Sequence, residues 1–252
     1  MRQYPPFAVV SETDHTAWII IAAAIGIPII LIFGGIRLAV RQPVNIGLDD
    51  ALIGGSTLVA IVQASLVLRA CSYGFGKESA QIDRSLLTRV QELYYGSNIL
   101  LLISLALSKA SVAALLLRLC IEKTQKKYFT GALAFVALWG LCSIFAVALQ
   151  CNLSKPAILF DGECSYVLLR WQIIGGMDIA WEVLVVAMAA YLMWNLQAPL
   201  ATKIQVVFAF SFRLLLIAPI AFRFHTFPEA RLAEDPSLPL ASFVAWTQAE
   251  LY

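Results

Sequence analysis

The segment Ser97–Cys120, SNILLLISLALSKASVAALLLRLC, decides the class of fold. It has the length and apolar character of a helix that crosses a bilayer, which needs about 20 predominantly apolar residues. Lys109 lies near its middle. A charged side chain at the bilayer centre costs about 3 kcal/mol on insertion scales and usually has a functional reason. The segment is therefore a candidate membrane span with an ammonium group inside it.

The composition of the whole chain agrees with a membrane protein. Of its 252 residues, 60% are hydrophobic and 13% are charged, whereas a soluble domain is nearer half apolar and one quarter charged. Six apolar runs have the length of a span, namely Ala17–Val40, Ala51–Ala70, Ser97–Leu119, Phe129–Gln150, Tyr166–Trp194 and Lys203–Phe224. A seventh run, Leu238–Tyr252, would cover roughly 20 Å of the ~30 Å hydrocarbon core. The seventh helix is therefore partial, or the chain is a truncated product.

We therefore predict an all-α fold, a polytopic transmembrane helix bundle with six full helices and a partial seventh. Residues 1–16 form an exposed N-terminal segment, and residues 17–252 form a single membrane domain. The first run is too long for the core of a signal peptide and has no small-residue cleavage site after it. The net charge of +2 gives no sign of a nucleic-acid partner. The expected partner is the lipid bilayer, of the plasma membrane or an endomembrane, and protein partners stay open.

Basic residues in the short loops predict the orientation. Arg37 and Arg41 follow the first run, and four more basic residues, Arg118, Lys123, Lys126 and Lys127, follow the third. Because cationic loops stay in the cytoplasm, the N-terminus should lie outside.

The loop after the second run is also basic, although it lies on the opposite side. Its sequence, KESAQIDRSLLTRVQEL, places Ile82, Leu86, Val90 and Leu93 at helical spacing. We interpret it as an amphipathic helix that lies in the membrane interface, which accounts for its charges.

The loop after the fourth run, CNLSKPAILFDGEC, is bracketed by Cys151 and Cys164. On the outer side this pair can form a disulfide; the alternative is two free thiols at helix ends. Asn152 begins an Asn-Leu-Ser glycosylation sequon close to the membrane. Neither the cysteines nor the histidines have metal-ligand spacing, and the sequence contains no phosphate loop, dinucleotide fingerprint or GxSxG motif. We therefore expect no metal and no cofactor.

Two cations and two anions lie inside predicted spans. Lys109 and Arg213 lie in the third and sixth runs, while Asp178 and Glu182 lie four residues apart in the fifth. With Trp171 and Gly175, the two carboxylates form one stripe on a helix. Because an unpaired charge is costly in hydrocarbon, we expect these groups to pair, with Asp178 or Glu182 nearest to Lys109. The alternative is that the pairs serve only to fix helix register and polar packing.

Three more carboxylates have plainer interpretations. Asp49 and Asp50 precede the second run, where the helix dipole favours an anion. Glu250 lies in the seventh run, one turn after Trp246, and core packing accounts for it.

Short motifs in a fixed order resemble the fungal rhodopsin-like integral membrane family. The motifs are GLDDALI, YGFGK, SKASVAALLLRL, CNLSKP…GEC, GGMDI, AFRF and DPS…WTQAEL, and they run from about Gly47 to Tyr252. The resemblance implies a seven-helix bundle and does not imply retinal. The family includes receptor-like surface sensors and membrane proteins encoded beside mycotoxin enzymes. The chain departs from the family in having Lys77-Glu78 where a histidine is usual, and in ending early.

Several function classes remain after this resemblance. The first is an accessory role in a fungal secondary-metabolite pathway, with a small apolar metabolite as partner, and the close alternative is a receptor-like surface sensor. A third is a membrane-embedded terpenoid cyclase, in which Asp178 or Glu182 donates a proton and Trp171 and Trp181 stabilise the cation. A transporter is the least favoured, because the sequence shows no internal repeat.

Overall fold

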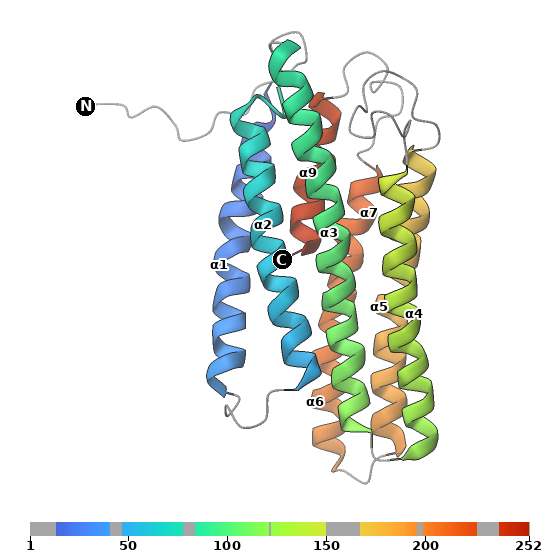
Figure 1. Ribbon diagram of the computed structural model, residues 1–252. Helices are drawn as coiled ribbons and strands as arrows, with labels where there is room; N and C mark the ends of the chain where they lie inside the picture. Colours follow the sequence, from blue (N-terminus) through green and yellow to red (C-terminus); the bar gives the residue numbers. More distant parts are fainter. Residues whose placement is uncertain are drawn as a thin grey trace, which may run out of the picture.

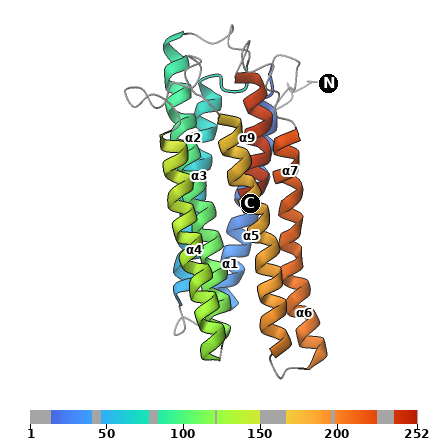
Figure 2. The same cartoon turned by 90° about the vertical axis from the view of Figure 1, so that its right-hand side faces the viewer.

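The computed structural model describes residues 14–40, 47–77, 84–120, 122–149, 167–195, 199–225 and 237–251. Within these ranges the chain forms helices and turns and no β-strand. The helices are α1 (Thr16–Val40), α2 (Leu48–Ser72), α3 (Arg84–Leu119), α4 (Lys123–Ala148), α5 (Val167–Asn195), α6 (Leu200–Ser211), η3 (Phe212–Leu216), α7 (Ile217–His225) and α9 (Ser237–Leu251). They pack lengthwise into a bundle (Figures 1 and 2).

Six stretches of the described chain are long and apolar enough to cross a membrane. Large apolar side chains cover the outside of the bundle, among them Phe33, Leu58, Leu138 and Phe208. Such a continuous apolar surface is unfavourable in water and suits contact with acyl chains. The protein is therefore an all-helical integral membrane protein, as the sequence predicts.

Helix α3 lies between α2 and α4 (Figure 1). Helix α9 packs against α1, α7 and α3. It has 15 residues, and its C-terminal end lies about midway along α3 in both views (Figures 1 and 2). The seventh helix is thus partial within the described chain.

The sixth span is one rod made of three segments, α6, η3 and α7. Its middle segment, η3, is a 3-10 helix that ends at Leu216. Pro219 lies one turn further on and has no backbone N–H to donate to the carbonyl of Leu215. Loss of this hydrogen bond explains why the α-helical pattern changes here. In α1, by contrast, Pro28 lies within a continuous helix.

The prediction of an interfacial helix after α2 is wrong for the residues from Arg84 onward. These residues are the first turns of α3, which runs unbroken to Leu119. Val90 is fully buried beside Phe75 and Tyr94. An apolar stripe of this spacing suits either a helix in the interface or a helix in a bundle, and extending a helix that has already formed is easier than starting a second one. Residues 78–83, including Ile82, lie outside the described residues.

The YGFGK motif caps the start of α1. Gly76 has a φ of +93°, which disfavours any side chain, and a Cβ there would lie 3.1 Å from the backbone nitrogen of Thr16. The Gly76 carbonyl accepts a hydrogen bond from the N–H of His15, and Lys77 forms an ion pair with Asp14. Of the expected N-terminal segment 1–16, residues 14–16 are described, and they are half-buried by these contacts.

Candidate functional site

Lys109 contacts Asp178 deep inside the bundle. The ammonium group of α3 donates to Oδ1 of the carboxylate on α5, and both side chains are less than a tenth exposed. Lys109 lies too far from either end of α3 for its side chain to reach the interface. The ion pair therefore supplies the counter-charge that the ammonium group needs in hydrocarbon.

Glu182 lies one turn after Asp178 and pairs with Arg213. The Arg213 Nε donates to Oε2 of Glu182 at 2.8 Å, and its Nη2 lies 3.5 Å from Oε1. Arg213 belongs to η3, so this contact joins α5 to the sixth span. The two carboxylates of α5 thus form ion pairs with two different cations.

A third ion pair joins Arg223 of α7 to Glu250 of α9. The Nη1–Oε2 distance is 2.7 Å, and both side chains are almost fully buried. The Arg223 guanidinium carbon also lies 5.1 to 5.6 Å from the ring centres of Trp171, Phe224 and Phe243, which is cation–π range. Sequence reasoning missed this pair: it assigned Glu250 to core packing and gave Arg223 no role.

The stripe on α5 faces all three cations. Trp171 contacts Arg223, while Asp178 and Glu182 pair with Lys109 and Arg213. At Gly175, an added Cβ would lie 2.4 Å from the Phe224 ring and 3.1 Å from Nη2 of Arg223. The glycine therefore leaves room for the arginine and its aromatic neighbours.

The three pairs meet at one polar cavity. Lys109, Glu182, Arg213 and Glu250 line it together with Ser56, Ser108, Leu105, Leu216, Ile220 and Leu251. The volume in which the centre of a water molecule fits is about 40 Å³, so the cavity can hold water. We call the three pairs and this cavity the interior charge cluster. It contains three basic and three acidic side chains.

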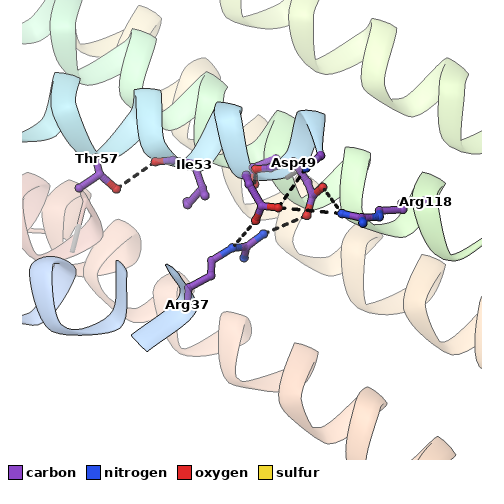
Figure 3. Close-up of polar contacts among 8 residues, drawn as sticks. Arg37, Asp49, Ile53, Thr57 and Arg118 are labelled. Carbon is purple, nitrogen blue, oxygen red and sulfur yellow. Dashed lines mark hydrogen bonds and ion pairs between the residues drawn. The ribbon is translucent and has the colours of Figure 1, made fainter. Parts of the chain in front are cut away.

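A second group of ion pairs ties α1, α2 and α3 together at the opposite end of the bundle from the YGFGK turn (Figures 1 and 3). Arg37 donates to Asp49 and Asp50, both at 3.1 Å, and Arg118 lies 3.3 Å from Asp49. Asp49 is 1% exposed. Both carboxylates lie in the first turn of α2, where the sequence places them, but their arginine partners were not anticipated.

Gln248 explains another part of the C-terminal motif. Its side-chain Nε2 donates to Oε1 of Gln63 on α2 at 3.1 Å, and both amides are buried. The WTQAEL segment therefore makes buried polar contacts with two other helices, through Gln248 with α2 and through Glu250 with α7. Periodicity shows only that these residues lie in an apolar run, so the partners 185 and 27 positions away were not visible.

Several predicted site residues lie elsewhere. Cys151, Cys164 and Asn152 lie outside the described residues, so the disulfide and the glycosylation site stay predictions. Cys71, Cys120 and Cys142 are free thiols. Trp181 stacks on Phe135 with ring centres 6.5 Å apart, on the α4 side of α5.

The comparison with protein families identifies the chain. The sequence model of the fungal rhodopsin domain matches residues 36–252. The chain belongs to this family. The matched range contains every residue of the interior charge cluster and of the group around Asp49, so both belong to the fungal rhodopsin domain. No curated protein and no solved structure matches the chain.

Proposed function

We propose that this fungal rhodopsin domain protein serves a fungal secondary-metabolite pathway by binding a small apolar metabolite from the bilayer. We further propose that it responds to the metabolite through its interior charge cluster. One observation carries the binding part: a single face of α5 contacts cations from three other helical elements, α3, η3 and α7. The pathway part rests on the resemblance to family members encoded beside mycotoxin enzymes.

Packing alone does not account for three ion pairs in hydrocarbon. Desolvation of a buried pair often exceeds the attraction between its charges, so apolar residues of the same volume are frequently as stable. Charged groups inside a membrane bundle accordingly mark functional positions. Here each pair joins two different elements, so a shift of α5 relative to α3 or the sixth span changes the pairs together. A ligand that favours one arrangement shifts the population of the bundle toward it.

The receptor-like sensor is the second candidate, and the group around Asp49 favours it. Arg37, Asp49 and Arg118 connect the ends of α1, α2 and α3 at the face that the basic loops place in the cytoplasm. Rearrangement of these contacts is a means of passing a change in the bundle to that face. The two candidates share the binding step and differ in the response that the bound metabolite causes.

The cavities favour binding over terpenoid cyclisation. The volume open to the centre of a water molecule is about 30 Å³ beside Asp178 and about 40 Å³ beside Glu182. An enclosed site for a drug-sized substrate occupies several hundred Å³. Trp171, one of the residues expected to stabilise a carbocation, instead contacts the Arg223 guanidinium.

Deletion of the gene in its fungus, followed by mass spectrometry of the metabolites, tests the proposal. A binding or sensing role predicts that the products of one pathway fall together, with no precursor accumulating. Wild-type protein and the exposed-lysine control Lys127→Met should restore them, whereas Lys109→Met should not. Accumulation of one uncyclised precursor would favour a cyclase, and unchanged metabolites would contradict the pathway role.

A further inference from the structure

We infer that a cavity between α3, α4 and α5 is a binding site for a small apolar alcohol. This inference rests on the proposed function, in that it specifies the ligand class and the site. The cavity lies on the α4 side of Asp178 and shares Leu105 and Lys109 with the cavity of the interior charge cluster. Its lining residues are Leu102, Leu105, Ala106, Lys109, Phe135, Val136, Trp139, Gly140, Ser143, Ile174, Met177, Asp178 and Trp181.

Three buried polar atoms of these lining residues have no hydrogen-bond partner in the part of the chain that the structure describes. They are Oδ2 of Asp178 and the indole Nε1 atoms of Trp139 and Trp181. Asp178 and Trp181 are each at least nine-tenths buried. A buried polar group without a partner costs about 1–3 kcal/mol, so native proteins rarely keep three together without something to satisfy them.

The chemistry of the three atoms selects the ligand. Together they offer one acceptor, the carboxylate oxygen, and two donors, the indole N–H groups. A hydroxyl group offers one donor and two acceptor lone pairs, and so it complements all three atoms. A ketone would leave the Asp178 oxygen without a donor, a carboxylate would be repelled by it, and a hydrocarbon would satisfy none of the three.

The walls and the opening favour an apolar ligand that arrives from the bilayer. Apart from the polar side chains of Lys109, Trp139, Ser143, Asp178 and Trp181, the lining is apolar or glycine. Phe135 is 43% exposed, and Leu138 and Leu141 near it on α4 face outward as well. The space inside the walls, about 30 Å³ for the centre of a water molecule, admits the hydroxyl end of such a ligand, and its apolar chain would extend through the open side.

Asp178 also links this site to the interior charge cluster. Its Oδ1 accepts from Lys109, while Oδ2 has no hydrogen-bond partner among the described residues. A hydroxyl on Oδ2 therefore binds the same carboxylate that holds α3 to α5. Water is the competing occupant, because the space of about 30 Å³ for a water centre admits it.

Equilibrium binding of two matched probes to purified protein in lipid nanodiscs tests the inference. The probes are radiolabelled farnesol, an apolar isoprenoid alcohol, and farnesyl methyl ether, which lacks the donor. We expect saturable farnesol binding and an affinity for the ether lower by about tenfold, because the Asp178 oxygen then gains no donor. Equal affinities, or no saturable farnesol binding, would overturn the inference and leave water or lipid as the occupant.

Three substitutions locate the site. Trp181→Phe and Trp139→Phe each remove one N–H and keep an aromatic ring, and each should weaken farnesol binding about tenfold. Trp194→Phe is the control, because Trp194 lies on the same helix as Trp181 and is 85% exposed. If both variants bind farnesol as tightly as the control does, the proposed site is contradicted.

The outcome separates this inference from the proposed function. Loss of pathway products on gene deletion together with no saturable farnesol binding would reject the alcohol site and leave the pathway role. Saturable farnesol binding that depends on Trp181, with metabolites unchanged on deletion, would reject the pathway role and leave the site.

Discussion

Arg223 and Glu250 hold the partial seventh helix to the sixth span from inside the bundle. Their Nη1–Oε2 distance is 2.7 Å, and the side chains are 1% and 3% exposed. Helix α9 packs against α1, α7 and α3. Its position therefore depends on contacts with its neighbours, and these include two buried polar ones, this ion pair and the Gln63–Gln248 hydrogen bond.

Glu250→Gln should destabilise the protein by about 3–5 kcal/mol, because it leaves the buried Arg223 guanidinium without its carboxylate. Unfolding in detergent, followed by tryptophan fluorescence, measures the loss. Glu92→Gln is the control, since Glu92 is an exposed carboxylate on α3. Equal stability of the two variants would mean that the pair does not hold α9.

Asp49→Asn should cost about 1–3 kcal/mol, since it replaces one of the two buried oxygens that accept from Arg37 and Arg118 by an NH2 group and removes the negative charge. Arg118→Ala should cost less, at most about 1 kcal/mol, because its side chain is 42% exposed and exposed pairs contribute little. Unfolding measured at low and high salt checks both. A larger loss for Arg118→Ala would contradict the view that Asp49 is the centre of this group.

Gly140→Ala should destabilise the packing of α4 on α3 by about 1–3 kcal/mol, because the new methyl group would lie 2.7 Å from the Cβ of Ala106. Gly131→Ala, on the same helix, is the matched control. Nothing lies within 4 Å of its added Cβ, so alanine should stabilise the helix slightly. A neutral Gly140→Ala would show that the two helices separate easily.

The loop between Cys151 and Cys164 should face the lumen or the exterior, as the loop charges predict. Thiol labelling of intact cells after reduction tests this in variants that keep one of the two cysteines and lack Cys71, Cys120 and Cys142. Labelling of Cys151 or Cys164 only from the cytoplasmic side would reverse the orientation.

The sequence predicts the spans and the interior charges because both depend on local features. Apolar runs of sufficient length mark the spans, and a lysine inside one of them requires an anion at similar depth. The spacing of Asp178 and Glu182 places both on one face of α5, so one of them had to be the candidate partner of Lys109.

The remaining contacts depend on which residues of different helices come together. Arg223 lies near the end of its span, where an arginine normally reaches the interface, and nothing local indicates that it turns inward to Glu250. The partners of Asp49 come from the ends of two other helices. The stripe of Leu86, Val90 and Leu93 was placed in the interface because its periodicity does not distinguish a lipid surface from a neighbouring helix.

A double-mutant cycle on Lys109 and the two carboxylates of α5 tests the central claim most directly. Lys109→Met should cost about 3–5 kcal/mol, because it strands the Asp178 carboxylate. Asp178→Asn added to it should recover part of the loss, with a coupling energy of about 1–3 kcal/mol. Glu182→Gln should add a separate loss, because Glu182 serves Arg213. Strict additivity between Lys109 and Asp178 in the free energy of unfolding would contradict the arrangement of ion pairs along α5.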